Sequence, residues 1–413
     1  MKDIISIYNK KRSLFANDKL TQISNTLFSK IAIVIPVYNE FPGIFNTFNS
    51  LSNSVYNAEL HFKNTKQTIR DRVTVVVVIN NPIEASKEAL ENNEILYRLL
   101  TQEHTDQTEP VLKNSLDFPF YLHVCYLKND KRVKSISKKK IGVGYARRYG
   151  MDLSLAYGAS VIACMDADTL VSNNYIETLF DFEKNKFGFG ICKFEHQKVP
   201  EDIRDSQKKQ KAIIAYEKYI KAHSECLKNT GTPYWAYALG PTIVCNAESY
   251  ASVGGMPIRK AGEDFYFIQS LEKLFLQRGN PKLQILDCTV YPSARLSTRV
   301  PFGTGQVLAG ASDVKSIPSV YAEKTYEAIH TFLSVMRETI KSGCFEIQWK
   351  LLPKNVIDFL KKEDFEVVWH KLVHENKNNP KNLEIAFHVW FDGLKIIRLM
   401  HFLEKDTSQI FDI

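Results

Sequence analysis

Long apolar runs are the first feature that this chain of 413 residues lacks. A helix that crosses a bilayer needs about 20 consecutive, mostly apolar residues. No run of that kind occurs, so we expect no membrane-spanning helix. Residues 1–5 also lack the apolar stretch that would open a signal peptide. We therefore expect a cytoplasmic protein, with peripheral contact at the inner membrane face left open.

Patterned cysteines and strong charge are also missing. The seven cysteines are scattered, without a CxxC pair, which favours reduced thiols over a disulfide framework. The formal net charge of +8 is modest for this length, and no zinc-finger or RNA-binding motif accompanies it. We expect no nucleic-acid partner. A basic face for phosphates or anionic lipid is the better interpretation of this charge.

An apolar run that ends in two carboxylates is the most informative feature that is present. Residues 161–165 predict a buried strand, and Asp166 and Asp168 follow at its end. Because a strand end can curl, both carboxylates could share one divalent cation with the phosphates of a ligand. The alternative is that they end the strand and cap a helix that begins near residues 172–174.

Three further apolar runs precede this strand and alternate with helical patterns. Residues 31–40, 73–79 and 120–127 predict strands, and residues 44–55 and 86–101 predict helices. This alternation predicts an α/β fold with a mostly parallel sheet flanked by helices. In open parallel sheets, ligands bind at the carboxyl ends of the strands. Polar residues that follow these strands are therefore candidate ligand contacts.

A basic segment lies between the third strand and the acid pair. Residues 128–140 carry seven basic side chains and one acidic one, and Gly144 and Arg147 follow. A basic loop that runs into a glycine-containing helix start could hold a diphosphate through main-chain N–H groups, the helix dipole and Arg147 or Lys140. The alternative is a solvated loop.

Two later segments supply candidates for acceptor binding and proton transfer. Trp235 and Tyr237 lie in an aromatic loop, and aromatic faces suit sugars, although such rings also fill cores. Glu263 and Asp264 open a helix, where the dipole keeps a carboxylate ionised, as a general base requires. The alternative is a plain helix cap. Spacing alone does not assign a role to either acid.

The end of the chain predicts a loop over phosphates and then a helical region. Arg295 and Arg299 lie in a loop with two glycines that could fold over phosphates and exclude water. From about residue 319, apolar residues recur at helical spacing, and we expect them to form a core. The expected parts are an N-terminal helical extension (1–30), an α/β domain (31–310) and a C-terminal helical region (311–413).

Several stretches, taken together and in order, resemble the glycosyltransferase family 2 type of nucleotide-sugar enzyme, on its GT-A fold. They are Ile-Val-Ile-Pro-Val-Tyr-Asn-Glu (33–40), Gly-x-Gly-x-x-Arg-Arg (142–148), the Asp-x-Asp motif (166–168), Gly-Gly (254–255) and Gly-Glu-Asp (262–264). The match covers residues 31 to about 305. The combination is specific, and no single stretch is.

The resemblance implies a nucleotide-sugar site. Pro36, Tyr38 and Glu40 would lie against the base and ribose. Asp166 and Asp168 would hold Mn²⁺ or Mg²⁺ against the diphosphate, where the cation stabilises charge on the leaving group.

The resemblance also implies a base and shows one departure. Asp264 would deprotonate the acceptor hydroxyl, with Glu263 beside it, in an inverting displacement. Such enzymes usually carry an aspartate at the end of the second strand, and here Asn80 and Asn81 stand there. An amide still donates and accepts hydrogen bonds to a base edge, so the identity of the nucleotide stays open.

These features predict a metal-dependent glycosyltransferase. It would move a sugar from a nucleoside-diphosphate sugar to a hydroxyl on a sugar, glycolipid or small molecule, in bacterial glycan or glycolipid biosynthesis. Alternatives are a retaining GT-A transferase, a nucleotidyltransferase, and a catalytically silent module that binds a sugar or nucleotide.

Overall fold

The fold is that of a computed structural model, and the residues that it describes divide into two compact units. The first unit comprises residues up to 204, 238–271 and 281–301, and the second comprises 205–237, 272–280 and the residues from 302 on. The described residues are 3–16, 30–61, 69–82, 84–101, 117–129, 141–259, 261–279, 283–295 and 320–404. The predicted boundary at residue 310 lies outside them.

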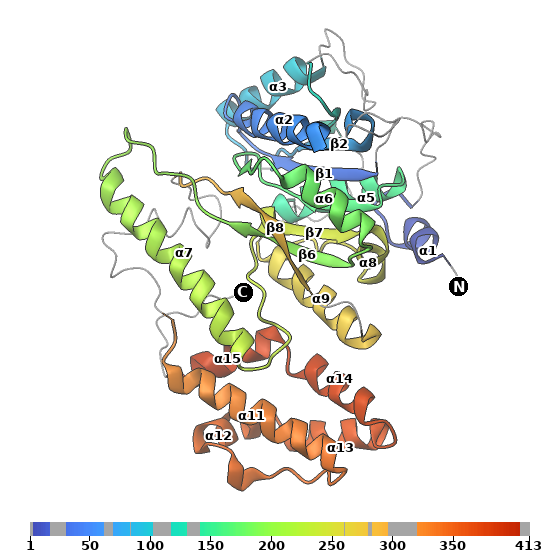
Figure 1. The fold of residues 1–413 in the computed structure, drawn as a ribbon, viewed down its shortest axis with the longest axis vertical. Coiled ribbons are helices and arrows are strands. Elements are labelled where there is room, and N and C mark those ends of the chain that lie inside the picture. Colours follow the sequence, from blue (N-terminus) through green and yellow to red (C-terminus); the bar gives the residue numbers. More distant parts are fainter. Residues whose placement is uncertain are drawn as a thin grey trace. The chain divides into compact units, whose positions relative to one another are not determined.

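The described part of the first unit contains one eight-stranded sheet, in the order β3-β2-β1-β4-β7-β6-β8-β5. Figure 1 labels its strands β1, β2, β6, β7 and β8. Its strands are β1 Ile31–Val37, β2 Val73–Ile79, β3 Tyr121–Tyr126, β4 Val161–Cys164, β5 Leu170–Val171, β6 Phe189–Phe194, β7 Ile243–Asn246 and β8 Gln284–Tyr291. Strands β3, β2, β1 and β4 are mutually parallel, as are β6 and β8. Strand β7 runs antiparallel to β4 and β6, and β5 to β8. The predicted α/β fold with a mostly parallel sheet is confirmed.

The register of the parallel strands brings their carboxyl ends to one edge. Val37 at the end of β1 pairs with Ile79 at the end of β2, and Val34 pairs with Cys164 at the end of β4. All residues of β2 are buried, as expected for a strand covered on both faces. The loops that follow β1, β2 and β4 therefore begin side by side.

Helices pack against this sheet and against one another. The first unit contains α1 Ile4–Lys11, α2 Ile44–His61, α3 Lys87–Thr101, α5 Val143–Ala156, α6 Tyr175–Lys184, α8 Ala247–Ser252 and the start of α9 Glu263–Arg278. Helix α5 packs on β1, β2 and β4. This approach requires Gly150, because a Cβ there would lie 2.4 Å from Cγ1 of Val34. Helix α1, from the predicted N-terminal extension, packs on α5 and α8, and the Tyr8 hydroxyl donates to Asp152 at 2.6 Å.

The second unit is helical in its described residues. It contains α7 Ser206–Asn229, the end of α9, α11 Glu323–Ser342, α12 Lys354–Lys362, α13 Phe365–Asn376, α14 Pro380–Trp390 and α15 Gly393–Glu404. It also contains the short 3₁₀ turn Trp349–Leu351, and the first unit contains the 3₁₀ turns Ile69–Arg72, Leu127–Asn129 and Gly240–Thr242. The predicted apolar stripe of α11 lies in a core with α12 to α15, so the C-terminal helical region is confirmed.

The sequence predicted neither a membrane-spanning helix nor a disulfide framework. None of the helices in the described ranges is long and apolar enough to cross a membrane. All seven cysteines are free, as the prediction of reduced thiols requires.

Candidate active site

The two acids of the Asp-x-Asp motif lie in a tight turn after β4. Two side chains hold the backbone of this turn: the Thr47 hydroxyl donates to the Ala167 carbonyl at 2.8 Å, and the Gln197 amide donates to the Asp168 carbonyl at 2.8 Å. The carboxylates of Asp166 and Asp168 pair with arginines. This arrangement differs from the alternative in which they cap the next helix.

Arg147 of α5 joins one of these acids to the start of α9. Its Nη2 donates to Oδ1 of Asp166 at 2.5 Å, and its Nη1 donates to Oε1 of Glu263. The arginine side chain is 5% exposed. Gly240 makes room for it, since a Cβ there would lie 2.1 Å from Nη2. Arg147 was predicted to contact the diphosphate; both its Nη atoms donate to carboxylates, and a contact with the diphosphate stays a prediction.

Arg295 makes a second link, between the acid turn and the loop after β1. Its Nη1 donates to Oε2 of Glu40 at 2.7 Å and its Nη2 donates to Oε1 of the same residue. Its Nε lies 2.8 Å from Oδ2 of Asp168. The sequence predicted all three residues at the nucleotide-sugar site, and the structure brings them together. Arg299 lies outside the described residues, as does Lys140.

Glu263 and Asp264 occupy the first turn of α9. Glu263 is buried, whereas Asp264 is partly exposed and its Oδ1 accepts a hydrogen bond from the Phe265 N–H at 2.8 Å. This bond joins neighbouring residues inside the helix and is not a helix cap, whose side chain accepts from the N–H two or three residues on. Burial raises the pKa of both acids, and the Arg147 charge opposes this shift.

Among the described residues at this edge, acidic groups outnumber basic ones. The two guanidiniums link four carboxylates, and Asp264 follows one of these in the chain, so five carboxylates exceed two guanidiniums by three negative charges when all are ionised. Burial raises the pKa of Asp168 to about 6, against the effect of Arg295. Within the described ranges, no group of three or more His, Cys, Asp or Glu side chains could hold a metal by itself.

The donor set nevertheless fits a hard divalent cation. The side chains of Asp166 and Asp168 remain 36% and 26% exposed. Carboxylate oxygens together with water and phosphate oxygens are the ligands that Mg²⁺ prefers, and one or two carboxylates suffice. An anionic diphosphate would be repelled by the surplus of carboxylates unless a cation accompanied it.

The predicted base site centres on Asn80 at the end of β2. Its backbone N–H donates to the Val37 carbonyl at 2.9 Å, and its Nδ2 donates to the Gly142 carbonyl at 3.2 Å. Its buried Oδ1 has no hydrogen-bond partner among the described residues. Pro36 and Tyr38 lie partly exposed on the neighbouring β1 end and loop. The Oδ1 is therefore an unsatisfied acceptor among the described residues, and its contact with a nucleotide base stays a prediction.

Gly144 lies at a close packing contact. A Cβ there would lie 2.6 Å from the Arg259 carbonyl oxygen and 3.2 Å from Cβ of Glu263. The glycine therefore lets the start of α5 approach the segment that precedes α9. A contact between Gly144 and a diphosphate stays a prediction.

The two predicted acceptor aromatics belong to the second unit. The Trp235 carbonyl accepts from the Ser224 hydroxyl at 2.7 Å, and the Lys228 ammonium lies 5.1 Å from the centre of the Trp235 ring. Tyr237 is partly exposed. Their contact with an acceptor stays a prediction.

Sequence reasoning missed several polar residues that hold the site. Thr47 and Gln197 fix the acid turn, as described above, and neither belongs to a motif. Asn93 of α3 is completely buried and bonds to the loops after β1 and β2. Two adjacent asparagines in the middle of a helix, where asparagine is unfavourable, are a signal that could have identified it.

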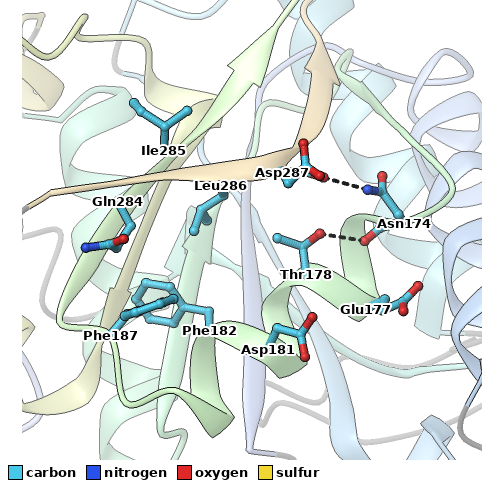
Figure 2. Close-up of a pocket in the computed structure, with 10 residues that line it drawn as sticks. All are labelled: Asn174, Glu177, Thr178, Asp181, Phe182, Phe187, Gln284, Ile285, Leu286 and Asp287. Atoms are coloured by element: carbon cyan, nitrogen blue, oxygen red, sulfur yellow. Dashed lines mark hydrogen bonds between the residues drawn. The ribbon is translucent and has the colours of Figure 1, made fainter.

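A cavity of about 330 Å³ lies elsewhere in the first unit, between α6 and β8 (Figure 2). None of the predicted site residues lines it. In Figure 2 the Asn174 amide donates to the Asp287 carbonyl, and the Thr178 hydroxyl donates to the Asn174 carbonyl. Asp287 also pairs with Lys193. The side chains of Asn174, Thr178 and Asp287 therefore already have bonding partners within the protein.

Comparisons with known proteins give structural likeness only. No protein-family model and no curated sequence matches the chain. Among solved structures, S. aureus TarS 1-349 in complex with UDP-GlcNAc is 13% identical, with 87% of this chain and 92% of that chain covered and a TM-score of 0.41. Mannosyltransferase PcManGT from Pyrobaculum calidifontis, in complex with GDP-Man and Mn²⁺, is 12% identical, with 96% and 86% covered and a TM-score of 0.36. At these TM-scores, function has to be inferred from the chain's own side chains.

Proposed function

We propose that this chain is a metal-dependent glycosyltransferase that moves a sugar from a nucleoside-diphosphate sugar to a hydroxyl acceptor. The main support for this proposal is the carboxylate-rich edge of the sheet. There, two arginines join the loops after β1 and β4 and the start of α9. Burying like charges together costs stability. A site that keeps such a set is suited to a cation and its anionic ligand.

Asp166 and Asp168 would hold the cation, Mn²⁺ or Mg²⁺. When bound, the cation supplies positive charge that stabilises the leaving diphosphate. Arg147 fixes the direction of Asp166 by bonding one of its two oxygens. Arg295 restrains Asp168 and Glu40 in the same way.

Asp264 is the better candidate for the general base. Glu263 is buried and paired with Arg147, whereas Asp264 is partly exposed. The raised pKa of Asp264 moves it toward the range in which a carboxylate accepts a proton effectively. In an inverting displacement, this base would face the sugar carbon on the side opposite the leaving group.

Asn80 is the candidate contact for the nucleotide base. Since its Nδ2 already donates to Gly142, the remaining Oδ1 can accept a hydrogen bond from a ring N–H or an exocyclic amine. Uracil and guanine both carry such donors. This chemistry supports a base contact without naming the base.

Thermal stability with nucleoside diphosphates tests the proposal. Ligands that bind the folded state raise its melting temperature by mass action. We expect at least one of UDP, GDP, ADP and CDP to raise it in the presence of Mn²⁺ and not with EDTA. The Asp168→Asn variant should lose this metal-dependent shift.

Asp181→Asn is the matched control, because Asp181 is exposed and lines the cavity between α6 and β8. This variant should show the same Mn²⁺-dependent rise in melting temperature as the wild type. An unchanged metal-dependent shift in Asp168→Asn would remove the metal site from the proposal. Release of pyrophosphate instead of nucleoside diphosphate during turnover would replace sugar transfer by nucleotidyl transfer.

A further inference from the structure

Three consecutive residues of α3 hold the ends of three neighbouring strands. Helix α3 packs against β3, and its residues 92–94 read Asn-Asn-Glu. Successive residues of a helix point about 100° apart, so three in a row can address different neighbours. Together these three residues bond the loops after β1 and β2 and the end of β3, at the carboxyl edge of the sheet.

Asn93 links the loops after β1 and β2. Its Oδ1 accepts from the Asn39 N–H at 2.8 Å, and its Nδ2 donates to Oδ1 of Asn81 at 2.7 Å. The same Nδ2 lies 3.4 Å from the Asn80 carbonyl. Asn93 is completely buried. It therefore bonds the residue that follows Tyr38 and both the carbonyl of Asn80 and the residue that follows it; Tyr38 and Asn80 are two of the predicted base contacts.

The flanking residues extend the link in both directions. Asn92 bonds the backbone of Phe41 twice, donating to its carbonyl at 2.7 Å and accepting from its N–H at 3.1 Å. Glu94 accepts from the Tyr126 hydroxyl at the end of β3 and from the Lys128 ammonium, both at 3.1 Å. Asn81 closes the chain of bonds by donating to the Tyr126 hydroxyl at 3.2 Å.

The two asparagines lower the stability of helix α3 but hold the neighbouring loops. Asparagine is among the weaker helix formers because its side chain competes for backbone bonds. Here both asparagines of the pair bond backbone groups outside the helix. The Tyr126 hydroxyl donates to the Glu94 carboxylate, which can only accept when ionised, and accepts from the Asn81 amide, so the direction of both bonds is fixed.

We propose that Asn93, supported by Asn92 and Glu94, is a positioning residue that sets the base selectivity of the nucleoside-diphosphate site. The inference rests on the proposed function and adds to it a residue that determines base selectivity and lies outside the sequence motifs. Asn93 fixes the distance between the β1 and β2 loops and so the place of the Asn80 acceptor. The acids that would hold the cation, after β4, are not among its partners in the described contacts.

Calorimetric titration separates base recognition from phosphate binding. UDP, GDP, ADP, CDP and inorganic pyrophosphate are each titrated in the presence of Mn²⁺. In Asn93→Leu, affinity for the preferred nucleoside diphosphate should fall about tenfold, the loss of roughly one well-made hydrogen bond. Its preference over the other bases should shrink, and the pyrophosphate affinity should stay within twofold of the wild type.

Asn246→Ala is the matched control for general destabilisation. Asn246 also makes two side-chain bonds, accepting from the Ser249 N–H and donating to the Phe187 carbonyl. It pairs with Val161 at the opposite end of β4. This variant should lower the melting temperature and leave every ratio of affinities unchanged. If Asn93→Leu does not fold, Asn81→Ala removes the Asn93 partner from the partly exposed side and should give the same change in ratios.

The outcomes distinguish the inference from the function on which it rests. Wild-type binding with unchanged base preference in Asn93→Leu, or in Asn81→Ala where the first variant does not fold, would overturn the positioning role and keep the transferase proposal. A parallel loss of pyrophosphate affinity would also overturn it, since the effect would then be general. Absence of any Mn²⁺-dependent nucleotide binding in the wild type would overturn both.

Discussion

The carboxyl edge of the first unit and the core of the second unit are stabilised in different ways. The second unit buries aromatic and aliphatic side chains against one another, and Phe332 contacts the rings of Phe365, Phe387 and Phe391. The edge of the first unit gathers acids around Arg147 and Arg295. Apolar burial stabilises a fold directly, whereas buried ion pairs contribute little net stability.

This difference distinguishes the candidate site from an apolar core. An apolar core of aromatic rings requires only side chains of suitable size and shape. At the acidic edge the charges are paired, but such pairing adds little net stability. Each carboxylate left without its arginine would carry a large desolvation penalty. The predictions below test this contrast by removing a ring, an arginine and an isolated acid.

The largest effect is expected from Phe332→Ala in the second unit. Phe332 is completely buried, and truncation of such a ring leaves a cavity that costs about 4 kcal/mol. All four tryptophans lie in this unit, so urea denaturation followed by tryptophan fluorescence reports it selectively. The conservative Phe332→Leu should cost about half as much. A loss below about 1 kcal/mol in Phe332→Ala would show that the core is not tightly packed there.

A smaller loss, about 3 kcal/mol, is expected from Arg147→Met. Removing one partner of a buried pair leaves the other charge uncompensated. The value is at the low end because Asp166 is 36% exposed and can be hydrated. Far-ultraviolet circular dichroism during urea denaturation measures it. Lys193→Met is the control, since the Lys193–Asp287 pair in the same unit is exposed and its loss should not be measurable.

The double variant Arg147→Met, Glu263→Met sharpens the same test. Replacing both members of a buried pair by apolar groups often restores stability. We expect the double variant to be more stable than Arg147→Met alone. If it is less stable, Glu263 contributes through bonds other than the one with Arg147.

The sequence predicted the elements of the edge but not how they are joined. Strand ends are encoded locally by apolar runs that stop at polar residues, and this was enough to place Asp166 and Asp168 after β4. Arg295 and Glu40 are 255 residues apart, and no local pattern specifies their pairing. Only the register of the sheet brings them together.

The residues that were missed share a physical reason. Thr47, Gln197 and Asn93 act on backbone carbonyls and N–H groups of distant loops, so their partners carry no side-chain signature. Arg147 was placed correctly at the start of α5, but its burial between two carboxylates depends on Gly240, which lies far along the chain. Tertiary packing decides such roles.

Glu272 is an exception to the contrast, since it is an acid buried in the second unit. Its Oε1 has no hydrogen-bond partner among the described residues, and burial raises its pKa from 4.5 to about 8. Between pH 4.5 and 8 the unfolded chain ionises this group while the folded protein keeps it protonated. The unfolded state then binds fewer protons, so stability is lost as pH rises through this window.

Glu272→Gln should remove this loss, because glutamine has nearly the same shape and no charge. Each pH unit between the two pKa values is worth about 1.4 kcal/mol, so a gain of about 2 kcal/mol over the wild type is expected at pH 6, decreasing toward zero at pH 4.5 and below. Tryptophan-detected urea denaturation at both pH values measures the difference, and subtraction of the wild type cancels the other titrating groups. A gain of the same size at both pH values would mean that glutamine improves packing and that Glu272 is ionised in the folded protein. In that case the second unit, like the edge of the first, would bury a charge, and the contrast between the two regions would be one of degree.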